Sequence, residues 1–161
     1  MADEMDDCCA NPTGREALCP RCRAAGAFVG PAPVLAHRPD AAAGDWHHCS
    51  TESCHVVFFL DDDTVPEDEV VARVGAKATD KPIPVCYCFA HTSADITADL
   101  VAHHGASTIS SDVRAAVASG TCACQRLNPN GKCCLPDIHR LVSAARQPPP
   151  AATSTDRTAR R

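Results

Sequence analysis

The stretch Cys49-Ser-Thr-Glu-Ser-Cys54-His-Val-Val-Phe-Phe-Leu60 joins a closely spaced cysteine pair to a short apolar segment. Residues His55–Leu60 are mostly β-branched or aromatic and three aspartates follow them, so this segment is predicted to be a buried β-strand. Another pair, Cys19-Pro-Arg-Cys22, lies 26 residues upstream. Two such pairs on tight turns, connected by short antiparallel strands, are typical of a zinc ribbon in which four thiolates bind one ion.

Zinc is the ion that this four-cysteine pattern favours. The candidate ligands are Cys19, Cys22, Cys49 and Cys54. Four thiolates form a closed tetrahedral site with no open position for catalysis, so the ion would serve to hold the ribbon folded. Three histidines flank the second pair and are alternative ligands, although we expect them at a strand edge: His47, His48 and His55. Trp46 is expected in the ribbon core.

The composition agrees with a chain that metal ions stabilise. Cysteine accounts for 12 of the 161 residues and aromatic residues for 4%, so the chain can bury only modest apolar cores. The net charge of −5 argues against a nucleic-acid-binding surface. The longest uncharged apolar run, His55–Leu60, is too short to span a membrane. Met1–Asp7 is acidic and does not resemble a secretory signal, so we expect a cytoplasmic protein with reduced, metal-binding thiols.

The other half of the chain carries a second set of six cysteines, two more than a four-thiolate metal site needs. The set consists of Cys86, Cys88, Cys122, Cys124, Cys133 and Cys134. The C-x-C spacing of the first two places both sulfurs on one side of an extended segment. This suits two ligands of one iron in a 2Fe–2S cluster, although zinc also accepts the geometry. Spacing does not choose within the pairs 122/124 and 133/134.

The second half is predicted to be mostly helical. Helices are expected to begin at Thr92, at Ser110 or Ser111, and directly after Cys134. Asp95 would complete a partial capping box with Thr92. Helix N-termini bring unpaired N–H groups toward sulfur, which stabilises thiolates near them.

The remaining segments give weaker predictions. Strand character is expected over Phe28–Val29 and Pro33–Leu35. A short helix is expected over Pro66–Val74, capped by Thr64, followed by an extended linker over Ala76–Pro84.

Several motifs together resemble the amino-terminal domain of CopZ-type copper chaperones. Cys86-Tyr-Cys88-Phe precedes a helix that begins Thr-Ser-x-x-Ile, and Ser-Gly-Thr-Cys122-Ala-Cys124 follows the second predicted helix. Asn128-Pro-Asn-Gly-Lys-Cys133-Cys134-Leu precedes the last helix. The ribbon motifs and Arg73-Val-Gly-Ala-Lys77 fit the same domain, so the resemblance covers residues 19 to 142. The carboxy half is also similar to bacterioferritin-associated ferredoxin.

This resemblance implies a small α+β protein, with a zinc ribbon of short antiparallel strands followed by a mostly helical 2Fe–2S-binding domain. The expected divisions are a flexible acidic arm (1–18), the ribbon (19–60), a short helix and linker (61–80), a ferredoxin-like cluster domain (81–145) and a disordered tail (146–161). The ribbon cysteines would hold zinc, and four of the six later cysteines would hold the cluster. The first choice is Cys86, Cys88, Cys122 and Cys133, because Gly-Lys-Cys before a helix matches the ferredoxin pattern.

The implied function is that of a cytoplasmic iron–sulfur and zinc protein of copper homeostasis. It would act as a metallochaperone or as a one-electron carrier that reduces Cu(II) to Cu(I). Its partners would be copper or another soft metal ion and a copper-transport or redox protein, without nucleic acid and without membrane insertion. Two alternatives are a ferredoxin-like adaptor that docks on a redox enzyme or iron store, and a structural double-zinc interaction module. The chain carries no classical enzyme motif, so metal binding is favoured over substrate turnover.

Copper itself has several candidate positions in the chain. The family's full-length chaperone carries a further copper-carrying domain with its own C-x-x-C motif, whereas here a proline-rich segment follows the last predicted helix. Two of the six later thiols would be spare beside the cluster, and soft thiolates suit Cu(I). The adjacent thiols Cys8 and Cys9 on the arm are another candidate for Cu(I).

Overall fold

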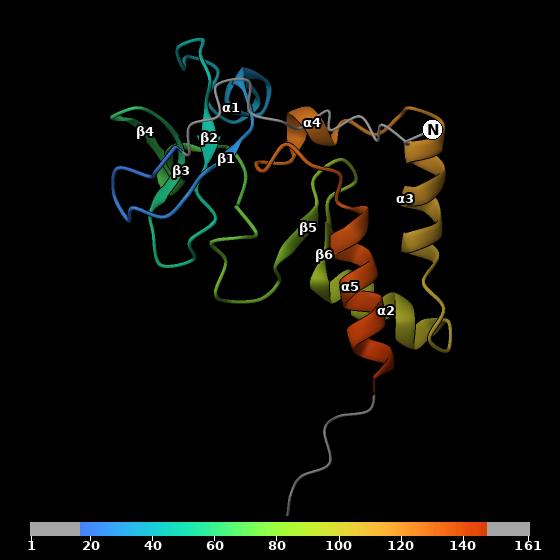
Figure 1. Ribbon diagram of the computed structural model, residues 1–161. Coiled ribbons are helices and arrows are strands. Elements are labelled where there is room, and N and C mark those ends of the chain that lie inside the picture. Colours follow the sequence, from blue (N-terminus) through green and yellow to red (C-terminus); the bar gives the residue numbers. More distant parts are fainter. Residues whose placement is uncertain (1–16, 148–161) are drawn as a thin grey trace, which may run out of the picture.

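The computed structural model describes residues 17–147, which form an antiparallel sheet and a group of helices lying side by side (Figure 1). The predicted α+β class is therefore confirmed. Cys8 and Cys9, together with most of the predicted arm and tail, lie outside the described residues. The predictions about them, and the proposed domain boundaries, remain predictions.

Four antiparallel strands in the order β1-β2-β3-β4 build the ribbon part. They are β1 (Ala27–Phe28), β2 (His47–His48), β3 (Val56–Leu60) and β4 (Asp63–Pro66). The apolar β3 is buried on both faces: Val57 packs with Trp46 in one core, and Phe59 packs beside Cys19 in another. The predicted strand is confirmed, beginning one residue later at Val56, and Trp46 is a core residue as expected.

A helix replaces part of the segment that was predicted to have strand character. Helix α1 spans Pro31–His37, so the prediction is wrong for residues 33–35, although Phe28 does lie in β1. Pro31 has the fixed φ that suits a first helical position. Gly30 before it adopts a φ of +67°, which glycine reaches without strain.

The helix predicted over Pro66–Val74 is also absent from the described residues. Thr64 lies in β4, opposite Phe59 of β3, instead of capping a helix. The three acidic residues that follow form only a single 3₁₀ turn, η1 (Glu67–Glu69). Pairing with the buried β3 therefore outweighs the local helix signal, because tertiary contacts commonly override propensity.

A two-stranded sheet and four helices make up the second part. The elements are β5 (Pro84–Cys86), β6 (His91–Thr92), α2 (Ser93–Ala102), α3 (Thr108–Ala118), α4 (Cys124–Leu127) and α5 (Leu135–Arg146). Thr92 and Asp95 form the expected capping box, here complete. Ser107 caps α3, so this helix begins earlier than predicted, and α4 was not predicted. Helix α5 begins directly after Cys134, as predicted.

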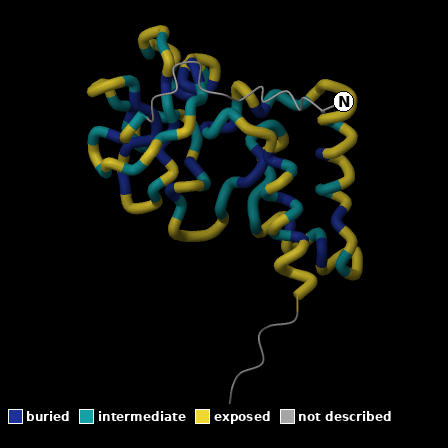
Figure 2. Tube along the Cα trace, viewed as in Figure 1, coloured by how far each residue is buried: buried dark blue, intermediate teal, exposed yellow. Residues whose placement is uncertain are grey.

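The core of the second part lies where its helices face β5. Val85, Ile96, Val113 and Ile138 are buried there together with Cys86, Cys124 and Cys134. Figure 2 shows buried segments along the inner sides of the helices and inside the ribbon part, with exposed residues outside. Helix α5 includes Arg146, so it extends one residue into the predicted tail. Among residues 17–147, no helix has the length and apolar character to cross a membrane.

Candidate metal centres

The four ribbon cysteines converge on one point. The Sγ atoms of Cys19, Cys22, Cys49 and Cys54 all lie within 4.8 Å of one another. Sγ of Cys19 is 3.9 Å from that of Cys54, and Sγ of Cys22 is 3.6 Å from that of Cys49. Tetrahedral zinc with Zn–S bonds near 2.3 Å requires sulfur–sulfur distances of about 3.8 Å. The thiols therefore fit a four-coordinate zinc ion.

Two tight turns place these thiols. In the first turn, Cys19 N donates to Ala24 O at 2.8 Å and Arg23 N donates to Cys19 O at 2.9 Å. In the second, Cys54 N donates to Thr51 O at 3.1 Å, while Cys49 N is tied to Val57 O of β3 at 2.9 Å. Backbone hydrogen bonds thus close the turn of each cysteine pair, and β3 fixes the second turn relative to the sheet.

The environment of the ribbon thiols is uneven. Burial raises the pKa of Cys54 to about 12 and also raises the pKa of Cys19. Sγ of Cys22 lies 3.5 Å from the Thr51 hydroxyl oxygen. When Cys22 is a thiolate that hydroxyl can donate to it, which lowers the pKa of Cys22 to about 6. Cys22 is therefore more ready to bind a cation than Cys19 and Cys54, which need the cation to favour their charged form.

The three histidines beside the second pair take no part in this cluster. His55 is exposed, whereas His47 and His48 lie in β2, between β1 and β3, and not at a sheet edge as expected. The His47 ring stacks on Phe59 with a centroid distance of 5.6 Å. The group that can hold a metal ion in the ribbon consists of cysteines alone.

A second convergence of thiols lies in the other part of the molecule. The Sγ atoms of Cys88, Cys122 and Cys124 lie within 4.8 Å of one another, with separations of 3.6 Å (88–122), 3.5 Å (88–124) and 3.1 Å (122–124). Sγ of Cys124 is also 3.8 Å from that of the buried Cys134. Cys86 is buried in the same core as Cys134, and its contact with the Cys134 thiol lowers the pKa of Cys86 to about 6.

Five of the six predicted thiols thus form one connected group, and Cys133 stands apart. Cys133 is exposed, while its neighbour Cys134 is completely buried. Sequence reasoning named all six residues, but its first choice included Cys133. The contacts Cys86–Cys134 and Cys88–Cys124 form two thiol pairs, and the Cys124–Cys134 contact joins them. These four thiols are as many as one four-thiolate metal site requires.

Local structure explains why these thiols meet. Cys86 ends β5, and the turn that follows carries Cys88 toward the start of α4. Cys124 is the first residue of α4, and Cys134 directly precedes α5. The backbone N–H of Ala123 donates to Cys88 Sγ at 3.3 Å. Helix starts were expected near Cys88 and near Cys133 and Cys134, whereas α4 was missed because four residues are too few to show a helical period.

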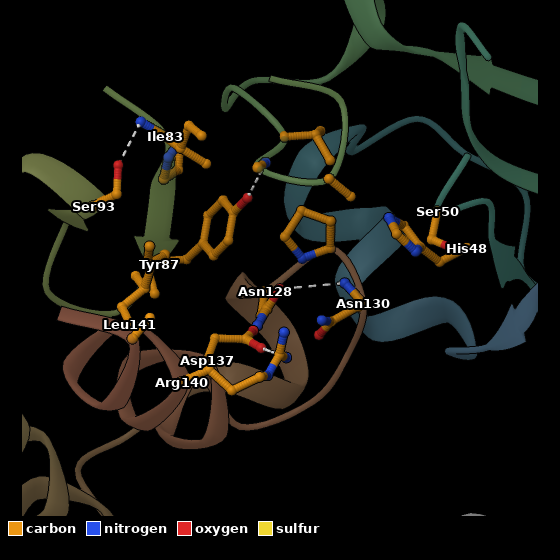
Figure 3. Close-up of a pocket in the computed structure, with 17 residues that line it drawn as sticks. His48, Ser50, Ile83, Tyr87, Ser93, Asn128, Asn130, Asp137, Arg140 and Leu141 are labelled. Carbon is orange, nitrogen blue, oxygen red and sulfur yellow. Dashed lines mark hydrogen bonds and ion pairs between the residues drawn. The ribbon is translucent and has the colours of Figure 1, made fainter. Parts of the chain in front are cut away.

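A cavity of about 620 Å³ lies where the two parts meet (Figure 3). His48 enters it from β2, while Tyr87, Asp137 and Arg140 line the other side. Among the described residues, Nε2 of His48 is buried without a hydrogen-bond partner. Burial, and then the positive charge of Lys77, lower the pKa of His48 to about 4, so its imidazole is neutral near pH 7. No described cysteine lines this cavity, which is therefore separate from both thiol clusters.

Two comparisons relate this arrangement to a known protein. No protein-family model matches the chain. A 74-residue region is 40% identical to the copper chaperone CopZ of Archaeoglobus fulgidus; it covers 44% of this chain and 36% of that chaperone. The X-ray structure of the A. fulgidus CopZ N-terminal domain matches with a TM-score of 0.60 and 31% identity, over 78% of this chain and 97% of that domain. The chain belongs to the family of the CopZ N-terminal domain.

The CopZ part of the predicted resemblance is therefore confirmed. The matched region spans about a third of the curated chaperone's length, so the relationship concerns its amino-terminal domain and not the whole protein. The similarity of the carboxy half to bacterioferritin-associated ferredoxin remains a prediction. The zinc and 2Fe–2S assignments of the two thiol clusters likewise remain predictions.

Proposed function

We propose that this protein is a cytoplasmic zinc and iron–sulfur protein of copper homeostasis, which binds Cu(I) or supplies the electron that forms it from Cu(II). The observation that carries the proposal is the presence of two separate thiol clusters in a member of the CopZ family. Free thiols persist in the reducing cytosol, which is where such ligands remain available to metal.

In this proposal the ribbon cluster is a structural zinc site. Cys19, Cys49 and Cys54 are buried, and Cys22 is half-buried. Their distances suit a single tetrahedral ion, and such an ion is redox-silent. Cys19, Cys22, Cys49 and Cys54 would then tie two turns of a sheet whose own core is small.

The second cluster is proposed as the 2Fe–2S site, held by four of the six later cysteines. Burial and contacts favour Cys86, Cys88, Cys124 and Cys134 over the first choice from sequence. When bound, such a cluster would supply reversible one-electron transfer. Cys88 is half-buried, whereas the other three of these cysteines are buried, so the site is nearest to solvent at Cys88. The backbone N–H of Ala123 donates to the Cys88 sulfur there.

Copper is the proposed cargo of this protein. With four thiols assigned to the cluster, Cys122 and the exposed Cys133 remain as soft ligands for Cu(I). The relative is named a copper chaperone, which supports a copper-transport protein as the partner that receives the ion. Cys8 and Cys9 remain a further candidate pair outside the described residues.

A structural double-zinc module is the second candidate function. The three thiols Cys88, Cys122 and Cys124 lie 3.1–3.6 Å apart, and a single zinc ion could take all three with Cys134 as the fourth ligand. A ferredoxin-like adaptor without copper is the third, since it requires the same cluster but no spare thiol.

Metal analysis of anaerobically purified protein distinguishes these functions. The proposal predicts about one zinc and two irons per chain and a reddish-brown visible spectrum. Colourless protein with two zincs and no iron after anaerobic reconstitution would establish the double-zinc module instead. With the cluster present, a Cu(I) titration against a soft competitor separates chaperone from adaptor: the chaperone retains Cu(I), and the adaptor does not.

A further inference from the structure

Lys77 is a buried cation that pairs with no carboxylate in the part of the chain that the structure describes. The residue is only 4% exposed, and its Nζ donates a 2.7 Å hydrogen bond to Thr51 O. Lysine is rarely buried this completely unless an opposite charge compensates it. None of the ion pairs among residues 17–147 includes Lys77. Within residues 17–147, the group that balances its charge is therefore not a carboxylate.

A candidate source of negative charge is the ribbon's thiol cluster, which Lys77 reaches through Thr51. Thr51 lies in the loop between Cys49 and Cys54, and its hydroxyl oxygen is 3.5 Å from Cys22 Sγ. Lys77 thus binds the backbone of the residue whose side chain contacts a ligand sulfur. Four thiolates around Zn²⁺ carry a net charge of −2, and a buried charge of this kind is stabilised by a nearby cation.

The segment that carries Lys77 is held in place from the other part of the molecule. Gly75 N donates to the Tyr87 hydroxyl at 2.7 Å, and Tyr87 stands between Cys86 and Cys88. Figure 3 shows Tyr87 pointing from the β5 side toward this loop. A Cβ at position 75 would lie 2.3 Å from Pro84 O, so only glycine allows the segment to pack this closely. Lys77 therefore reaches the ribbon from a segment fixed by the second part.

We propose that Lys77 is the counter-cation of the ribbon's thiolate site, a positioning residue that favours the zinc-bound, negatively charged state. This inference rests on the proposed zinc site. It makes zinc binding depend on a residue that lies outside the ribbon segment and is anchored beside the second thiol cluster. In the metal-free protein the thiol cluster carries less negative charge than it does with zinc bound, so the ammonium contributes less to stability there.

The test compares Lys77→Met, which keeps the aliphatic stem, with Lys77→Arg, which keeps the charge, and with the exposed Lys81→Met as the control. Zinc affinity is measured by competition with a chromophoric chelator, and the melting temperature is measured with and without zinc. We expect Lys77→Met to weaken zinc binding at least tenfold, Lys77→Arg to remain within about threefold of wild type, and Lys81→Met to have no effect. Lys77→Met should lower the melting temperature of the zinc form by more than that of the metal-free form.

The outcomes separate this inference from the zinc proposal itself. Wild-type protein that binds no zinc would refute the zinc site, whereas wild-type affinity in Lys77→Met would refute only the role of Lys77. Equal loss of zinc affinity in Lys77→Met and Lys77→Arg, or equal loss of stability with and without zinc, would show that Lys77 acts through packing. If Lys77→Met does not fold, Lys77→Arg decides alone: a tenfold loss of affinity overturns the inference.

Discussion

Two adjacent cysteines, Cys133 and Cys134, have opposite environments. Cys134 is buried in the core and contacts Cys124 and Cys86, while Cys133 is exposed and outside the connected thiol group. We therefore expect Cys134→Ser to reduce the iron content to less than a tenth of the wild-type value. Cys133→Ser should keep the iron content and the visible spectrum but bind less Cu(I). Iron analysis and visible spectroscopy of both variants check this prediction.

The matched pair of substitutions makes the result informative, because both replace one sulfur with oxygen at neighbouring positions. Full iron content in Cys134→Ser together with loss of iron in Cys133→Ser would mean that the residue before α5 rearranges around the cluster. Sequence spacing alone does not distinguish these neighbours. The choice depends on how α5 packs against β5 and α2, and these contacts join segments far apart in the chain.

At the level of single elements, the sequence predicts a structure correctly where the hydrogen bonds that decide it join residues close together in the chain. The start of α2 is such a case: Thr92 Oγ1 accepts from Asp95 N at 3.3 Å, and the Asp95 carboxylate accepts from Thr92 N at 2.8 Å. Both bonds depend only on residues three positions apart, so the sequence predicts them. Helix α1 and strand β4 were mispredicted because the ribbon core decides them: Val34 and Val65 are both buried in it.

The capping box of α2 gives a prediction at the element scale. Thr92→Ala removes the hydroxyl that accepts the Asp95 N–H, so the free energy of unfolding should fall by about 1 kcal/mol. Thr97→Ala on the same helix is the control, because Thr97 is exposed and only bonds back to Ser93 O. Its expected change lies within about 0.5 kcal/mol. Urea unfolding of the metal-loaded proteins measures both, and equal effects of the two substitutions would contradict a specific role for the cap.

For the whole molecule, the decisive feature is the contact between its two parts. Helix α1 of the ribbon part packs against α4, which begins with Cys124, and Val29 lies beside Gly131 in the loop before Cys134. His37 at the end of α1 is buried, and its Nε2 lies 2.9 Å from Leu127 O at the end of α4. The second thiol cluster is thus supported by the ribbon, which no motif in either half of the sequence indicates.

His37 consequently gives a pH-dependent prediction for the whole fold. Burial lowers the pKa of His37 below its ordinary value of 6.5. The unfolded chain therefore takes up a proton as the pH falls below about 6.5, while the folded protein resists protonation. The stabilising contribution of neutral His37 is fully present above pH 6.5 and is lost as the pH falls toward its folded pKa. His37→Gln keeps an N–H donor for Leu127 O but does not titrate.

The test measures the free energy of unfolding of wild type and of His37→Gln in chemical denaturant from pH 8 to pH 5. The difference between the two proteins isolates the pH-dependent contribution of His37 to stability. The stability of wild type relative to His37→Gln should be constant from pH 8 to 7 and should decline below pH 6.5. Loss of zinc or iron in acid affects both proteins and cancels in the difference, which makes the comparison specific to the junction. The exposed His104→Gln is the control and should show no such trend. A pH-independent difference would mean that His37 is not held neutral between α1 and α4, and that the two parts are joined more loosely than this hydrogen bond implies.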